Sequence, residues 1–289
     1  MITPHLQYYV QYPISLDCAL QCPYCFHSAD RGKPWQRGFT IEQYAAWRDK
    51  HMQGADRILI TFHGGEPSIP RNMDDIVDVL SKTTVEHVEI LTNGLGNTDQ
   101  YRRLLPYANR VDRIICTYHR TVLDPGQRLR FNMAVCWMQM MDLPVVVKEL
   151  LIHNDYDEVI ANQRQWRDRD VDVLVADFRG MDRGRSFEEW GKYDYNDHQL
   201  ISPEFRHFGP RCHCNQGYRN VIIRGGWFHP GDVLACWEDA KCVGSIQDGT
   251  YNPDHYVSKN EITGEVQVVG EGTYQGTYHH DVYHPGVDK

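Results

Sequence analysis

The sequence of 289 residues lacks the long apolar runs that a membrane helix requires. No apolar run approaches the roughly 18 to 20 residues that span a bilayer. Residues 1–10 also lack the basic stretch and the apolar stretch that mark a secretory signal peptide. We therefore expect no membrane segment and a cytoplasmic location.

Positively charged residues are fewer than negatively charged ones. The chain has 30 Lys and Arg against 39 Asp and Glu, for a formal net charge of −9. Because nucleic-acid binding depends on clustered basic side chains, this balance argues against a general nucleic-acid coat. A solvated face is the simpler interpretation of the one local basic group, and a nucleotide substrate is the alternative. This group consists of Arg102, Arg103, Arg110, Arg113 and Arg120.

Low-complexity segments and exact repeats are absent from the sequence. Instead, short β-rich runs alternate with longer amphipathic runs, and several β-rich runs are nearly continuous Val, Ile and Leu, as in buried parallel strands. The predicted strands are residues 8–15, 57–62, 87–91, 111–116, 144–150 and 171–176. This alternation predicts a parallel α/β fold with its chemistry at the carboxyl ends of the strands. The pattern fits both an open sheet and a barrel.

Helix signals lie between these strands. Thr40 and Gln43 form a predicted capping box, Asn72 is a predicted N-cap, and Asp124-Pro125 is expected to begin a further helix. Other helices are expected from residue 98 and over residues 154–169. The apolar face of the helix after Pro125 is predicted to consist of Leu129, Met133, Cys136, Trp137 and Met140.

Seven of the nine cysteines fall into two groups near the ends of the chain. Cytosolic thiols stay reduced, so clustered cysteines there are more often metal ligands than disulfide partners. The first group, Cys18, Cys22 and Cys25, has the spacing C-x3-C-x2-C and directly follows the first predicted strand. Three thiolates on one loop hold three corners of an iron–sulfur cubane and leave the fourth iron open. A zinc site is the alternative, although zinc usually takes four ligands.

This loop, with Tyr24 just before its last cysteine, resembles the signature of the radical S-adenosylmethionine (SAM) superfamily. The resemblance implies a [4Fe–4S] cluster whose open iron binds the amino and carboxylate groups of SAM. It also implies a partial (βα)6 barrel of the TIM type, which agrees with the six units predicted above. We therefore expect this barrel followed by a small C-terminal β-hairpin and cysteine module.

Two further motifs strengthen the resemblance. The sequence HGGEP at residues 63–67 follows the second predicted strand and resembles the family's GGEP motif, which contacts the amino group of SAM. The sequence TNG at residues 92–94 ends the third strand and resembles another common stretch of the family. Glycines permit close backbone approach, and a carboxylate complements an ammonium group. The cofactor-binding residues that the resemblance implies in the three motifs are Tyr24, Gly64, Gly65, Glu66, Pro67 and Asn93.

The second cysteine group consists of Cys212, Cys214, Cys236 and Cys242. It flanks a hairpin predicted over residues 220–229 with its turn at Gly225-Gly226. The spacing from Gly231 to Cys236 resembles the start of the SPASM and shorter twitch extensions, and twitch fits better because the later SPASM cysteines are absent. The resemblance implies a second [4Fe–4S] cluster that relays electrons or orders the substrate pocket, with zinc as the alternative. The expected domains are residues 1–204, 205–250 and a tail, 251–289.

Other candidates lie at predicted strand ends. A thiol, phenol or imidazole there could deliver a hydrogen atom or a proton, and packing is the alternative role. The catalytic candidates are Cys116, Tyr118 and His119. Binding of SAM or of the substrate is expected from Lys148, Asp177 and Arg179.

These observations predict a radical SAM enzyme. An external electron donor such as flavodoxin or ferredoxin would reduce the first cluster, and SAM would be cleaved to methionine and a 5′-deoxyadenosyl radical. That radical would take hydrogen from a peptide or small polar metabolite, giving oxidation, epimerisation or crosslinking. One alternative is modification of a nucleobase or nucleotide in DNA or RNA. Another is a non-catalytic iron–sulfur or zinc scaffold or redox sensor, against which the GGEP motif argues.

Overall fold

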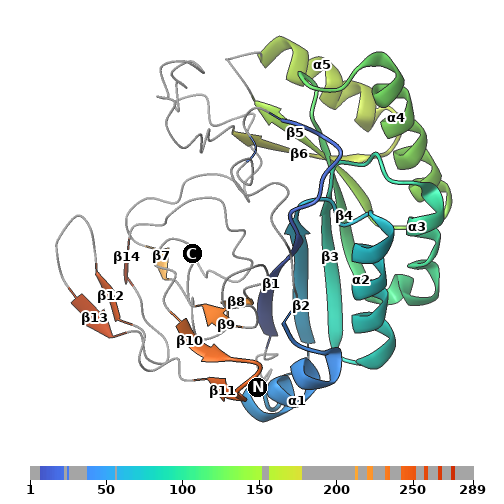
Figure 1. Ribbon diagram of the computed structural model, residues 1–289. Coiled ribbons are helices and arrows are strands. Elements are labelled where there is room, and N and C mark those ends of the chain that lie inside the picture. The colour runs from blue at the N-terminus through green and yellow to red at the C-terminus, as the bar shows by residue number, and fades with distance from the viewer. Residues whose placement is uncertain are drawn as a thin grey trace, which may run out of the picture.

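The computed structural model describes residues 7–22, 25, 38–55, 57–151, 156–177, 212–213, 220–223, 232–234, 242–251, 257–259, 266–268 and 275–276. Six parallel strands lie side by side in chain order in one sheet (Figure 1). They are β1 (Gln7–Ser15), β2 (Arg57–Gly64), β3 (Glu86–Thr92), β4 (Val111–Tyr118), β5 (Val145–Leu151) and β6 (Asp172–Asp177). Each predicted strand end lies within two residues of the observed one.

Helices follow the strands and cover one face of this sheet (Figure 1). They are α1 (Ile41–His51), α2 (Pro70–Lys82), α3 (Thr98–Arg102), a 3₁₀ helix (Leu105–Arg110), α4 (Pro125–Met140) and α5 (Tyr156–Arg167). The alternation of strand and helix gives a partial barrel of the TIM type, as predicted.

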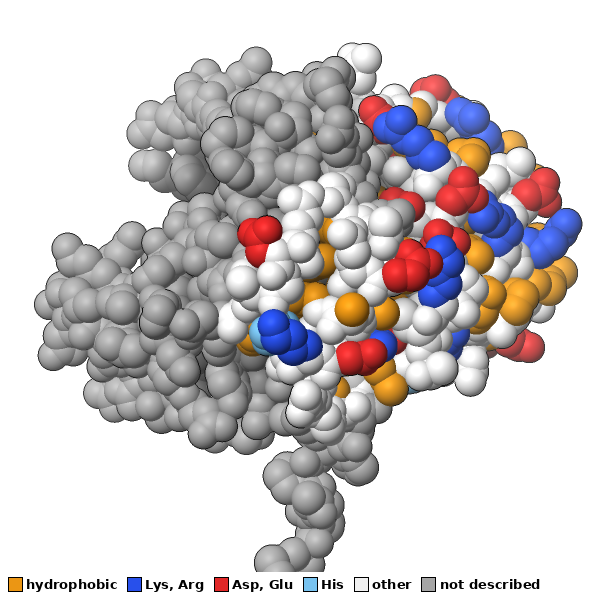
Figure 2. All heavy atoms as spheres, turned by 60° about the horizontal axis from the view of Figure 1, so that its bottom comes forward, with side chains coloured by type: hydrophobic (Ala, Val, Ile, Leu, Met, Phe, Trp, Pro, Cys, Tyr) orange, Lys and Arg blue, Asp and Glu red, His pale blue; other side chains and the backbone are white. Residues whose placement is uncertain are grey.

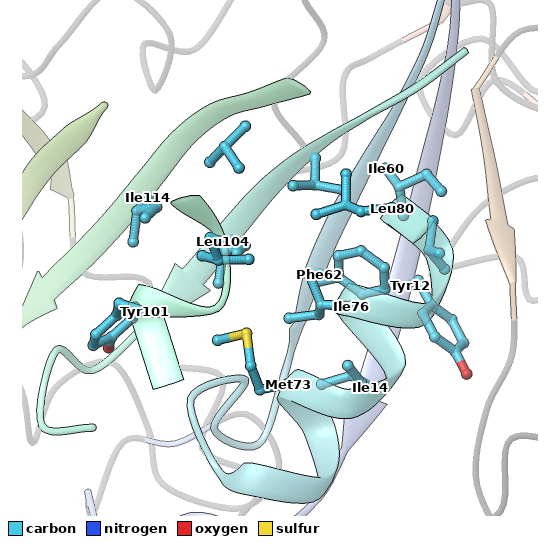
Figure 3. Packing of buried hydrophobic residues seen from close by; sticks show 14 of the residues in the cluster. Tyr12, Ile14, Ile60, Phe62, Met73, Ile76, Leu80, Tyr101, Leu104 and Ile114 are labelled. Atoms are coloured by element: carbon cyan, nitrogen blue, oxygen red, sulfur yellow. The ribbon is translucent and has the colours of Figure 1, made fainter. Parts of the chain in front are cut away.

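The hydrophobic core lies between the sheet and these helices. Figure 3 shows Phe62 and Ile60 of β2 facing Met73 and Ile76 of α2, and all four are at most 2% exposed. Strand residues that face the helices alternate with residues that face the other side of the sheet, as the two-residue period of a strand requires. The core therefore fixes which side chains are available on the opposite face.

Two of the three predicted helix caps are confirmed. The Thr40 and Gln43 side chains form a capping box at α1, and Asp124 caps α4 in the same way with Gln127. The prediction for Asn72 is wrong, because α2 begins two residues earlier, at Pro70. Proline is favoured in the first turn because its missing N–H has no helical partner there.

The predicted apolar face of α4 is also wrong. Leu129 and Met133 are 61% exposed and Met140 is 80% exposed. The opposite face packs on the sheet instead, and its buried residues are Phe131, Ala134, Val135 and Met138. Both faces of α4 carry apolar residues, so periodicity alone favoured the wrong one.

The C-terminal part of the chain extends the same sheet beyond β1. Strand β8 (Asn220–Ile223) pairs in parallel with β1, and three antiparallel strands follow it outward. These are β9 (Asp232–Leu234), β10 (Cys242–Ser245) and β11 (Thr250–Tyr251). The predicted Gly225-Gly226 turn lies outside the described residues. Ile223 pairs with Val233, whereas a two-residue turn would pair it with Phe228.

Two short strand pairs complete the described structure. Strand β12 (Val257–Lys259) pairs with β13 (Val266–Val268), and β14 (Gln275–Gly276) pairs with β7 (Cys212–His213). The segment from β10 to β11 contacts α1, because Trp47 Nε1 donates a hydrogen bond of 2.9 Å to the Thr250 carbonyl oxygen. The C-terminal strands are therefore attached both to the sheet and to the first helix.

Candidate active site

The loops after β1 and β2 are hydrogen-bonded to each other through their backbones. Gly65 N–H donates to the Ser15 carbonyl oxygen at 2.5 Å, and Glu66 N–H donates to the Asp17 carbonyl oxygen at 2.6 Å. Gly64 has a φ of +109°, and a Cβ there would lie 2.6 Å from the Ser15 oxygen. Glycine is required because both the backbone angle and the close approach exclude a side chain. The GGEP motif thus holds the start of the first cysteine loop.

Asn72 joins the same two loops from α2. Its Nδ2 group donates hydrogen bonds of 2.7 Å to Ser15 Oγ and of 2.7 Å to the Glu66 carbonyl oxygen. The side chain is 3% exposed, so these bonds form away from water. Asn72 therefore clamps the two loops, a role that the sequence pattern did not reveal.

The Glu66 carboxylate connects the loop after β2 with the end of β3. It accepts hydrogen bonds from Ser68 N–H at 2.8 Å, from Asn93 N–H at 2.7 Å and from the Thr92 hydroxyl. Burial raises the pKa of Glu66, and these hydrogen bonds oppose that shift. These three donors fix the position of the Glu66 carboxylate between the two loops, and its contact with the amino group of SAM stays a prediction.

Side chains from the ends of β3 and β4 reach the cysteine sulfurs. Asn93 Nδ2 lies 3.6 Å from Cys18 Sγ, and His119 Nδ1 lies 3.7 Å from Cys22 Sγ. Cys22 is buried, while Cys18 and Cys25 are half-buried. Burial raises the pKa of the Cys18 thiol, and the nearby Glu66 charge adds to this effect. The motifs after β1 and β3 therefore meet at one place, as the strand order predicts.

The donor set of the first cysteine loop, three thiols on one loop, suits an iron–sulfur cluster. In the described part of the chain, no three His, Cys, Asp or Glu side chains are grouped closely enough to hold one metal ion. Ligands of a zinc ion must converge on one atom at about 2.3 Å. Ligands of a cubane bind different irons and need not converge. The Asn93 amide N–H beside Cys18 also suits the negative charge of a thiolate ligand.

Of the three catalytic candidates, only His119 lies at the cysteine loop. Burial and the nearby Lys148 charge lower the pKa of His119 to about 4, so its ring is neutral at pH 7. Lys148 is half-buried on β5, and its place in the site stays a prediction.

Cys116 and Tyr118 lie in the layer between the sheet and the helices. Cys116 is 0% exposed within the hydrophobic core, and burial raises the pKa of its thiol well above the usual value. The Tyr118 ring lies 5.0 Å from the Phe131 ring and 6.4 Å from the Trp166 ring, measured between centroids. Their surroundings correspond to the packing role, because both side chains face α4 and α5 rather than the cysteine loop.

Pro67 is buried directly after Glu66. Several other predicted site residues lie wholly or partly outside the described residues. Asp177 ends β6, Cys212 begins β7 and Cys242 begins β10, but only their backbones are described. The predictions for Tyr24, Arg179, Cys214 and Cys236 lie outside the described residues.

The arginines of the local basic group are individually engaged. Arg110 donates hydrogen bonds to the carbonyl oxygens of Leu80 and Thr83, and each of the other four pairs with a carboxylate. These pairs are Arg102 with Asp99, Arg103 with Asp74, Arg113 with Glu89 and Arg120 with Glu158. On the face seen in Figure 2, blue and red side chains of the described residues are interspersed. The arginines therefore do not form a single cationic surface.

Comparison with known proteins agrees with this geometry. Residues 12–127 match the model of the radical SAM superfamily. The structure of native anSMEcpe with bound AdoMet superposes with a TM-score of 0.61 at 15% identity, over 86% of this chain and 82% of that chain. The same protein with AdoMet and the Cp18Cys peptide gives 0.57 at 14% identity, over 84% and 78%. The complex of BtrN with AdoMet and 2-DOIA gives 0.44 at 14% identity, over 84% and 79%.

The class of protein follows from the fold together with the site. Residues 12–127 are similar to the radical SAM superfamily, and the partial barrel that contains them has the fold of anSMEcpe. The matched segment contains all three motifs that meet at the ends of β1, β2 and β3. Among the described residues, no helix has the length and apolar character needed to cross a membrane.

Proposed function

We propose that the enzyme holds a [4Fe–4S] cluster on Cys18, Cys22 and Cys25 and acts with SAM on a peptide or a small polar metabolite. When bound, the cluster supplies the electron that splits SAM into methionine and a 5′-deoxyadenosyl radical. The observation that carries the proposal is the direct hydrogen bonding of the GGEP loop and Asn93 to the cysteine loop.

The residues of this chain would hold and orient the reactants. The GGEP backbone and the TNG loop border the cysteine loop, so they are suited to bind SAM beside the cluster. Glu66 and Asn72 keep these loops in register through buried hydrogen bonds. A site fixed in this way stays preorganised when SAM and substrate enter, which lowers the cost of bringing the reacting groups together.

Hydrogen abstraction from the substrate would lead to oxidation, epimerisation or crosslinking. A peptide is supported by the likeness to anSMEcpe, which has been solved with AdoMet and a peptide. A nucleotide substrate loses its main support, since the arginines that suggested it are paired individually. An external donor such as flavodoxin or ferredoxin would supply the electron.

A second [4Fe–4S] cluster on Cys212, Cys214, Cys236 and Cys242 is part of the proposal. The backbone pairing of β14 with β7 puts Gly276 beside Cys212, and β10 begins with Cys242 next to β9. A twitch-like module over residues 205–250 would continue the barrel through β8. The tail, residues 251–289, would pair through β14 with β7 near the start of this module. Zinc remains the alternative occupant of these cysteines.

The test is anaerobic reconstitution with iron and sulfide, followed by dithionite and SAM. We expect 5′-deoxyadenosine, with about eight irons per chain as two cubanes require. The triple variant Cys18/Cys22/Cys25→Ala should lose this product, whereas Cys136→Ala, which removes a thiol from α4, should keep it. About four irons with full activity would leave one cluster and assign the C-terminal cysteines to zinc or to structure. Iron-loaded protein that neither binds nor cleaves SAM would favour the scaffold alternative.

A further inference from the structure

His119 reaches the first cysteine loop from a distant part of the chain. It directly follows β4, and its Nδ1 lies 3.7 Å from Cys22 Sγ across 97 residues of sequence. Cys22 is only 6% exposed, so this contact is shielded from water. A contact of a ring nitrogen with a buried sulfur ligand bears on the chemistry of that sulfur.

The backbone around His119 holds the ring in place. Arg120 N–H donates to the Tyr118 carbonyl oxygen at 2.9 Å, and Leu123 N–H donates to the His119 carbonyl oxygen at 3.0 Å. Arg128 of α4 then donates to the carbonyl oxygens of Arg120 and Leu123 at 2.9 and 3.1 Å. The turn between β4 and α4 is therefore fixed from both sides, and the imidazole does not depend on the cysteine alone for its position.

The direction of the hydrogen bond follows from the sulfur's chemistry. A sulfur that binds iron is a thiolate and carries no proton, so only the nitrogen can donate. The bond is therefore Nδ1–H to sulfur. Asn93 offers the equivalent bond to Cys18 from the neighbouring strand end, at 3.6 Å. Two of the three sulfurs thus receive side-chain donors from β3 and β4, and each donor serves a different sulfur.

We propose that His119 is a positioning residue that donates a hydrogen bond to the Cys22 thiolate and thereby raises the reduction potential of the cluster. This inference rests on the proposed cluster at Cys18, Cys22 and Cys25. Reduction adds negative charge to the cluster and its thiolates, and a donor to sulfur stabilises the reduced state more than the oxidised one. His119 then acts through Cys22, not on the substrate.

The experiment compares three full-length proteins after anaerobic reconstitution: wild type, His119→Leu and His119→Gln. Iron is counted, and the reduced cluster is followed by electron paramagnetic resonance during a redox titration. The signal that changes on SAM addition identifies the first cluster. Leucine removes the donor, whereas the glutamine amide restores an N–H of similar reach.

We expect His119→Leu to lower the ratio of reduced to oxidised cluster at a fixed potential about threefold to tenfold, the worth of one hydrogen bond. At 59 mV per tenfold for one electron, the potential falls by about 30 to 60 mV. His119→Gln should stay within about twofold of wild type. At full reduction, the SAM-sensitive signal should keep its wild-type intensity in both variants, because the three cysteines are unchanged.

Equal potentials in wild type and His119→Leu, at equal iron content, would overturn the inference while leaving the proposed function intact. If His119→Leu does not fold, His119→Met serves as the donor-free variant of similar volume and the same comparison applies. A wild-type protein that assembles no SAM-sensitive cluster would overturn the proposed function and the inference together.

Discussion

In the loops after β1, β2 and β3, polar groups hold the structure, whereas the layer behind them, between the sheet and α4 and α5, is held by packing. Glu66 in these loops and Asn72 of α2 beside them are almost fully buried, yet each makes several hydrogen bonds. Phe131 and Cys116 are equally buried in the layer and lie among apolar neighbours. Burial is therefore stabilised differently in the two regions. A buried polar group needs hydrogen-bond partners, whereas a buried apolar group needs close packing against other side chains.

Removing a ring from the layer should have the largest effect. Phe131 packs between Tyr118 and Trp166, with ring centroids 5.0 and 5.8 Å away. Phe131→Ala should lower the free energy of unfolding by about 4 kcal/mol, because the cavity cannot refill. Met133→Ala is the control on the exposed face of the same helix and should cost about 0.5 kcal/mol or less. Urea unfolding of both variants measures this difference, and equal losses would contradict the assignment of the two faces.

Adding a methyl group to the loops should come next. Gly64→Ala places a Cβ against the Ser15 oxygen at a φ of +109° and should cost about 3 kcal/mol. Gly54 also has a positive φ, +73°, which L-residues rarely adopt. In Gly54→Ala, however, nothing lies within 4 Å of the added Cβ. We expect it to cost about 1 kcal/mol, from the backbone conformation alone. Thermal unfolding and iron content measure both, and only Gly64→Ala should lose iron.

The Glu149 carboxyl is the polar exception within the layer. It is 0% exposed and lies near Asn162 and Trp166, although neither oxygen has a hydrogen bond of good geometry in the described structure. Burial raises the pKa of Glu149 from about 4.5 to about 7, and the Arg120 charge partly offsets this shift. The folded protein therefore holds a proton that the unfolded chain releases between these values.

Stability should accordingly fall as the pH rises from about 4.5 to 7, by up to ~3 kcal/mol from this group. Glu149→Gln removes the ionisation, so it should raise stability relative to wild type at pH 8 by ~3 kcal/mol and have little effect at pH 4.5. Melting curves of both proteins across this range provide the measurement. A constant difference at every pH would show that Glu149 does not titrate in this window.

Asn72→Ala should have the smallest of these effects on stability and a specific effect on the site. The loss of its two buried hydrogen bonds should cost ~2 kcal/mol and loosen the cysteine loop, which lowers iron retention. Asp124→Ala removes a true N-cap, at α4, and should cost ~1 kcal/mol without loss of iron. If the two variants retain iron equally well, Asn72 does not support the site.

The positions of the strands were predicted well from the sequence, because short, nearly continuous runs of Val, Ile and Leu are typical of buried parallel strands. It failed for α4, since residues 129, 133 and 140 are as apolar as residues 131, 134 and 138 and only the position of the sheet decides between them. It failed for Asn72 because an Asn near a helix start usually caps it, and the Pro70 signal two residues earlier was missed.

The three motifs of the site were also predictable, as was their meeting at neighbouring strand ends. The contacts between them were not. Asn93 and Cys18 are 75 residues apart, and His119 and Cys22 are 97 apart, so no local spacing encodes these pairs. The predicted roles of Cys116 and Tyr118 depended on which face of β4 they occupy, and this follows only from the packing of α4 and α5.

The pairing of β1 with β8 has a consequence for biosynthesis. Gln11 and Ile222 are partners in this ladder, so one leaves the ribosome 211 residues before the other. At 5 to 20 residues per second, the interval is roughly 10 to 40 seconds. During that time the side of β1 that awaits β8 is an open sheet edge, able to pair with another chain. The nascent protein therefore presents its first cysteine loop beside an uncovered strand until translation has passed β8.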